Sequence, residues 1–183
     1  NKAMSINPNF DYVLIETGFN SSKKSLVVSS KLLEKTLERY EMEKFNSLGQ
    51  VKGKELEGLK CKHPFFDQES TIISSSHVTE EIGTGFVHTA PAHGLEDYEA
   101  CRDYDFDNSS LVQADGKFTE EAPYVGGKKI SEANQVVIDI LKSKNLLMSK
   151  NKFRHSFPHC WRHKTPLFFR ATPQWFISMD KND

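Results

Sequence analysis

The sixteen residues from Gly83 to Tyr98, GTGFVHTAPAHGLEDY, constrain the fold of this chain more than any other stretch of its sequence. Glycine lets a backbone turn tightly or approach another group closely. The residues after Gly94 are typical of the first turn of a short helix. The order of these residues predicts a short strand, a tight loop and a helix, which bring the histidines and carboxylates close together. A metal site, an acid–base site and a purely structural turn all remain open at this point.

The two carboxylates of the stretch, Glu96 and Asp97, are adjacent in sequence. On a helix, adjacent side chains point about 100° apart, so only one of them can face a site. Asp97 falls in the first helical turn, where free N–H groups and the helix dipole favour the charged carboxylate. Such a group is a poor general base but a good partner for a substrate ammonium. The alternative is that Asp97 only caps the helix, and the sequence by itself favours that alternative.

Two groups of residues have the right chemistry for a metal. His88, His93 and Asp97 form the first group, but Pro91 keeps the histidines from sharing one face of a regular helix. The second group is His159, Cys160 and His163, which lacks the second cysteine of a zinc pair. We therefore expect no metal, and keep a metallohydrolase that uses His88, His93 and Asp97 as an alternative.

The remaining chain alternates short apolar runs with a few helical segments. We expect a hairpin from residues 11–17 and 25–30, a helix over 31–43, strands within 49–65 and 70–79, a short helix within 93–106, a helix over 131–145 with Ser131 as its N-cap, and a strand within 165–179. This pattern predicts an α+β domain built on a curled sheet or barrel.

Composition narrows the class of protein. The chain has 183 residues, 27% of them charged, with a formal net charge of −1 and three widely spaced cysteines. These values are typical of a globular protein in a reducing compartment, and the global charge gives no sign of a nucleic-acid binder. No apolar run approaches the roughly 20 residues of a membrane helix, and a signal peptide is missing. We expect a cytoplasmic protein with no membrane partner.

Charge is nevertheless uneven along the chain. Between Ile140 and Met179 there is no Asp or Glu, whereas lysines, arginines, histidines and aromatic residues are interleaved. Such a segment suits phosphate contact and base stacking, or else forms a solvated basic face over a buried strand.

These motifs resemble those of a known family. GTGFVHTAPAHGLEDY is similar to the signature of the editing domain of isoleucyl-tRNA synthetases, and HSFPHCWRHKTPLFFRATPQWF resembles the return of that domain to the synthetic core. NKAMSINPNFDYVL and VKGKELEGLKCKHPF also fit, so the resemblance covers essentially the whole chain. It implies the β-barrel-rich, α+β editing fold of class I aminoacyl-tRNA synthetases, with peripheral helices. It also implies a truncated editing core over residues 1–150 and a return segment over 151–183.

The resemblance also implies an activity: hydrolysis of valine misattached to the 3′ end of the isoleucine tRNA, and of valyl-adenylate. Asp97 matches the aspartate that holds the substrate ammonium, and His88 matches a histidine that lines the side-chain pocket and excludes isoleucine. His155 matches a histidine near the site, and Gly83, Thr84 and Gly85 complete the expected substrate-binding set. Catalysis would then depend mainly on positioning of water.

Some family features are absent from the printed sequence. The threonine-rich stretch that precedes NKAMSI and the two ATP-site signatures, HIGH and KMSKS, do not occur. Phe157 also stands where the family usually has tyrosine. We therefore expect a fragment of a longer synthetase that carries no cofactor itself, ATP and zinc belonging to other parts of the parent enzyme. A scaffold that binds the amino acid or the tRNA end without turnover is a second alternative.

Overall fold

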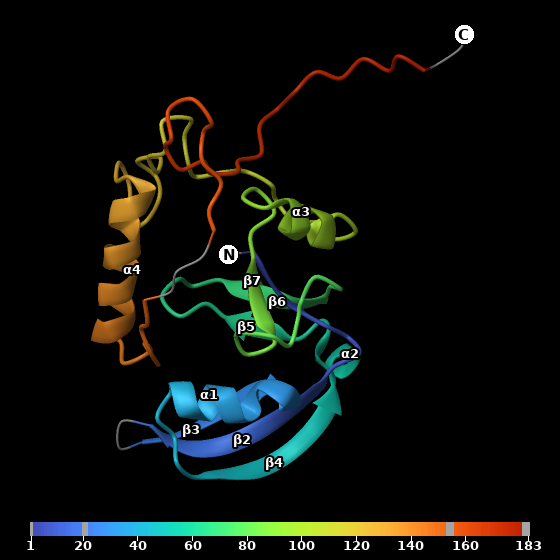
Figure 1. Ribbon diagram of the computed structural model, residues 1–183, viewed down its shortest axis with the longest axis vertical. Helices are drawn as coiled ribbons and strands as arrows, with labels where there is room; N and C mark the ends of the chain where they lie inside the picture. The colour runs from blue at the N-terminus through green and yellow to red at the C-terminus, as the bar shows by residue number, and fades with distance from the viewer. Residues whose placement is uncertain (1, 20–21, 153–155, 181–183) are drawn as a thin grey trace.

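The computed structural model describes residues 2–19, 22–152 and 156–180. Its strands form two sheets, and helices lie beside them (Figure 1). The strands are β1 (Ala3–Ile6), β2 (Asp11–Phe19), β3 (Ser22–Ser29), β4 (Phe45–Lys52), β5 (Lys60–Lys62), β6 (Glu69–Ser74) and β7 (Phe86–Thr89). The helices are η1 (Ser30–Leu32), α1 (Leu33–Arg39), α2 (Gly53–Leu56), α3 (Leu95–Cys101) and α4 (Ile130–Ser143). The predicted α+β class is confirmed, with two sheets in the described residues and no closed barrel.

The first sheet has the order β3-β2-β4 and is antiparallel throughout. The hairpin expected from residues 11–30 is present, with Tyr12 opposite Ser29 and Phe19 opposite Ser22. The inward side chains Val13 and Ile15 pack with Leu32 and Leu37 of the helical segment, and these four are at most 8% exposed. Burial of this apolar face fixes the predicted helix 31–43 against the sheet, where it forms η1 and α1.

The second sheet has the order β5-β6-β1-β7 and positions the candidate site. Its central strand β1 pairs in parallel with β6 and antiparallel with β7. Helix α3 covers one face, because Ala3, Ile73 and Cys101 form a common buried cluster. The strand–loop–helix order predicted for residues 83–98 is therefore present, as β7, a loop and α3.

Tyr12 joins the two sheets. Its side chain is fully buried, its hydroxyl donates to the carbonyl oxygen of Gly85 at 2.7 Å, and its ring meets the Phe86 ring edge-on at 5.1 Å between centroids. Gly85 has a φ of +83°, and a Cβ there would lie 2.6 Å from the Cβ of Ser29. The glycine-rich turn is therefore packed tightly against β2 and β3, which ties the candidate site to both sheets.

Two expectations for the C-terminal third are wrong. Helix α4 is capped by Lys129, with Ser131 inside the helix, because the Glu132 carboxylate accepts the Lys129 backbone N–H at 3.0 Å. The strand expected within 165–179 is absent; only an isolated bridge joins His159 to Pro166. Pro166 and Pro173 have no N–H to donate to a ladder, and no described strand lies beside Trp175, which is 100% exposed. In Figure 1 the C-terminal part of this segment leaves the body of the molecule as an extended chain.

Candidate functional site

The candidate site begins at the end of β7. His88 pairs with Met4 of β1, and the following residue, Thr89, pairs with Ala3. Because side chains alternate along a strand, His88 is exposed, whereas Thr89 is fully buried. The Thr89 hydroxyl lies 2.7 Å from the hydroxyl of Ser5, which is also fully buried. This pair fixes the register of β7, and with it the direction of the His88 side chain.

The loop after β7 is closed by Asp97. Its Oδ2 accepts the backbone N–H of Ala90 at 3.0 Å, from the first turn of α3. The same loop contains a turn in which the His93 N–H donates to the Ala90 carbonyl at 2.9 Å. Asp97 is partly buried, so this bond to a charged acceptor stabilises the loop appreciably. Asp97 therefore holds the loop in place through this hydrogen bond, in addition to carrying a negative charge.

The charge of Asp97 acts on Cys101, one turn further along α3. Burial first, and then the nearby carboxylate, raise the pKa of Cys101 to about 11. Cys101 is therefore a neutral thiol at pH 7, a buried apolar residue rather than a nucleophile. All three cysteines, Cys61, Cys101 and Cys160, are free thiols.

A cavity of about 750 Å³ opens beside His88. Its walls come from Lys2 just before β1, from β7 and the loop after it, from the segment 107–118, from the start of α4 and from the segment 157–169. Most side chains of the wall are apolar, among them Val112, Phe118, Phe157 and Phe168. A cavity of this size with an apolar wall and few polar groups is typical of a small-molecule site.

The polar groups of the cavity wall are His88, His93, Lys2, Asp107 and Ser109. Lys2 and Asp107 form an ion pair of 3.3 Å between Nζ and Oδ2. Sequence reasoning missed this pair, because 105 residues separate its members and no local pattern marks either of them. Only the three-dimensional pairing of β1 with β7 brings Lys2 beside His88.

The predicted site residues are only partly brought together. His88 lies in the cavity wall, and so does Phe157, whose side chain is 49% exposed. Asp97 is not part of that wall, nor are Gly83, Thr84 and Gly85. Thr84 and Gly85 contact Ser29 and Tyr12 instead. His155 lies outside the described residues.

The metal alternatives gain no support from the geometry. The His93 Nδ1 lies 3.1 Å from the carbonyl oxygen of Phe169, an acceptor only, so this nitrogen carries the proton and donates it. Cys160 Sγ lies 3.5 Å from His163 Nδ1, but His159 Nδ1 donates to the Phe157 carbonyl. Among the residues that the structure describes, no three His, Cys, Asp or Glu side chains are grouped so as to hold a metal ion.

Comparison with solved structures defines the class of protein. The chain superposes on the crystal structure of GlLeuRS-CP1 with a TM-score of 0.59, covering 82% of this chain and 79% of that one at 12% sequence identity. At that identity the likeness concerns the fold. The fold is therefore that of a CP1 editing domain of class I aminoacyl-tRNA synthetases.

Sequence comparison identifies the synthetase. The chain is 43% identical over 181 residues to the isoleucine–tRNA ligase of Colwellia psychrerythraea and 48% identical over 181 residues to that of Nitrosomonas europaea. Each match covers 99% of this chain and 19% of the relative, so the chain spans about a fifth of the length of these ligases. No protein-family model matches it. The chain belongs, as a segment, with the isoleucine–tRNA ligases.

Within the described part of the chain, none of the helices is both long and apolar enough to span a membrane.

Proposed function

We propose that this segment is an editing module that hydrolyses the ester between valine and the 3′ end of the isoleucine tRNA, together with valyl-adenylate. The observation that carries the proposal is the cavity beside His88, found in an editing fold and in a sequence related throughout to isoleucine–tRNA ligases. A synthetic site discriminates poorly between side chains that differ by one methylene, since that group contributes only about 0.8 kcal/mol of burial. A second, more restrictive pocket supplies the missing selectivity.

His88 is the proposed selectivity residue. It is held rigidly, because β7 is paired along β1 and the neighbouring Thr89 is locked by Ser5. An imidazole at this fixed backbone position, in a mostly apolar wall, restricts the space for a longer aliphatic side chain. In this account His88 acts by volume and takes no proton.

Asp97 is the proposed partner of the substrate ammonium. One carboxylate oxygen holds Ala90, which leaves the second available for an ammonium at the end of the loop. The carboxylate thus orients both the loop and the ester. Water placed by backbone groups and by the ribose hydroxyl of the terminal adenosine then attacks the carbonyl, so that catalysis is mainly positional.

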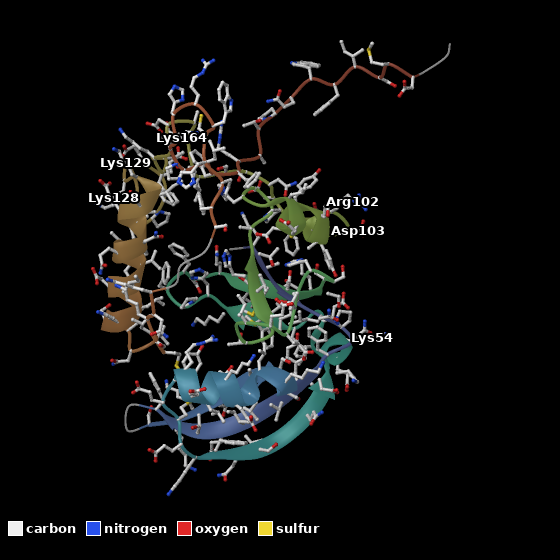
Figure 2. The ribbon with its side chains drawn as sticks, viewed as in Figure 1. Lys54, Arg102, Asp103, Lys128, Lys129 and Lys164 are labelled. Atoms are coloured by element: carbon white, nitrogen blue, oxygen red, sulfur yellow. The ribbon has the colours of Figure 1, made fainter. Side chains whose placement is uncertain are left out.

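The flank around the start of α4 is the proposed approach for the tRNA. Lys128, Lys129 and Lys164 are exposed, form no ion pair with any described residue, and lie on the same side of the molecule in Figure 2. We name these three residues the basic flank. Figure 2 shows Lys54 and Arg102 on the opposite side. Unpaired lysines on one side suit the phosphate backbone of a nucleic acid.

The selectivity role is tested by His88→Ala in a longer chain that includes the threonine-rich stretch. We expect this variant to deacylate isoleucyl-tRNA, which the unsubstituted chain spares, because the cavity gains the volume of an imidazole. His93→Ala is the matched control, since His93 lines the same cavity but lies on the loop. If His88→Ala still spares isoleucyl-tRNA, His88 does not set the selectivity.

A second candidate function is binding without turnover. It is favoured by the position of Asp97 outside the cavity wall. Binding of a non-hydrolysable valine ester, with no release of valine from the true ester, is the result that this alternative predicts.

A further inference from the structure

The cavity wall contains one lysine and one carboxylate, Lys2 and Asp107, among the described residues that line it. The Lys2 backbone N–H donates to the Thr89 carbonyl at 3.0 Å, which extends the pairing of β1 with β7 by one residue. Lys2 is thereby fixed beside the strand that carries His88.

The ion pair of Lys2 with Asp107 is easily exchanged. The two side chains are 44% and 62% exposed, so water screens their attraction and the pair stabilises the fold little. Asp107 also has partners of its own: its Oδ1 accepts the Ser109 N–H at 2.8 Å, and its Oδ2 accepts the Ser109 hydroxyl. The two Ser109 bonds first, and Lys2 after them, lower the pKa of Asp107 to about 2. Asp107 therefore stays charged and hydrogen-bonded when Lys2 leaves it.

We propose that Lys2 is the phosphate-binding group of this cavity, and that its ammonium exchanges Asp107 for the phosphate next to a bound nucleoside. The inference rests on the proposed function and assigns one contact of that substrate. The phosphate belongs either to an adenylate or to the phosphodiester on the 5′ side of the terminal adenosine of an RNA. In both cases the phosphate is attached to the 5′ oxygen of adenosine. Phe118, Phe157 and Phe168 in the cavity wall offer aromatic side chains for that nucleoside.

The test is direct binding of adenosine, AMP and the dinucleotide cytidylyl-adenosine to the 183-residue chain by titration calorimetry. We expect AMP, the dinucleotide or both to bind about fivefold more tightly than adenosine, the scale of one partly exposed charge-assisted contact. Lys2→Met should remove this phosphate preference, and Lys2→Arg should retain it. Lys31→Met is the matched control, because Lys31 is an exposed lysine that forms another ion pair, with Glu80 at 3.0 Å, and does not line the cavity.

Asp107→Asn separates the role of Lys2 from a general effect of charge. This variant releases Lys2 from its ion pair, so the phosphate preference should persist or increase. The double variant with Lys2→Met should show none. Preference for AMP alone would assign the phosphate to an adenylate, and preference for the dinucleotide alone would assign it to RNA.

Two results would overturn the inference: no phosphate preference in the unsubstituted chain, or a preference that survives Lys2→Met. The measurement involves no hydrolysis, and Asp97→Ala should leave the phosphate preference intact. A failure of the proposed editing reaction would therefore be distinguishable from a failure of the Lys2 assignment.

Discussion

At the scale of residues, the sequence was most informative where the special residues are close in the chain. The loop between His88 and Asp97 could be predicted, since its glycine and proline, and the acidic first turn of the helix that follows, all act locally. The contact of Asp97 with the Ala90 N–H could not, because it depends on how the loop folds back. The pair of Lys2 and Asp107 was also beyond prediction, since its members lie 105 residues apart and neither belongs to a helix or strand.

Asp97 and Glu96 provide a matched pair for the ammonium role. We expect Asp97→Ala to weaken binding of a non-hydrolysable valine ester by about tenfold, the scale of one hydrogen bond to a charged group. Removal of the bond to Ala90 should lower the free energy of unfolding by about 2 kcal/mol, the scale for a hydrogen bond to a charged group, and we expect the domain to stay folded. Glu96→Ala, which removes an exposed neighbouring carboxylate, should change neither value. Unchanged affinity in calorimetry of folded Asp97→Ala would exclude the ammonium role.

At the scale of elements, local patterns predicted the hairpin of β2 and β3, helix α1, and helices α3 and α4. Each of these has a clear apolar face or turn signal. Helices α1 and α3 bury residues against the adjacent sheets, whereas α4 buries only Ala133. The strand expected within 165–179 failed because apolar and aromatic composition alone cannot supply a pairing partner. The predicted N-cap of α4 was wrong for a related reason. Ser131 has the chemistry of an N-cap, but the helix begins before it, where the Glu132 carboxylate accepts the Lys129 N–H.

The turn at Gly83–Gly85 provides a test of how the two sheets are joined. Both glycines have positive φ, +88° and +83°, but only at Gly85 would a Cβ meet other atoms, at 2.6 Å from Ser29. Gly83→Ala should lower the free energy of unfolding by about 1 kcal/mol, because of backbone strain. Gly85→Ala should lower it by about 2–4 kcal/mol, because steric overpacking against Ser29 adds to the backbone strain. Urea unfolding of both variants checks the difference, and equal losses would show that Gly85 is not packed against β3 as described.

At the scale of the whole molecule, the near-neutral net charge conceals where the charged side chains lie. The acid-free segment from Ile140 to Met179 was visible in the sequence. The sequence did not show that this segment packs against the turn at Gly116 and the start of α4. The Ile130 N–H donates to the Gly116 carbonyl, and a Cβ at Gly116 would lie 3.5 Å from the Phe168 ring. These contacts bring separate parts of the chain to one side of the cavity.

The basic flank makes a prediction about salt. Replacing Lys128, Lys129 and Lys164 together by Gln should weaken tRNA binding and reduce the slope of log affinity against log salt by about 3, one unit for each lysine that no longer neutralises a phosphate. A control that replaces Lys54 and Arg102, on the opposite side of Figure 2, should leave the slope unchanged. Filter binding across a salt series measures both. An identical slope in the two variants would place the tRNA elsewhere.

The central claim is that this segment distinguishes valine from isoleucine on the isoleucine tRNA. The most direct measurement is deacylation of valyl-tRNA and isoleucyl-tRNA, both on the isoleucine acceptor, with Asp97→Ala as the control. The account predicts release of valine only, abolished by the substitution. Equal release of both amino acids, or release of valine that persists in folded Asp97→Ala, would contradict it.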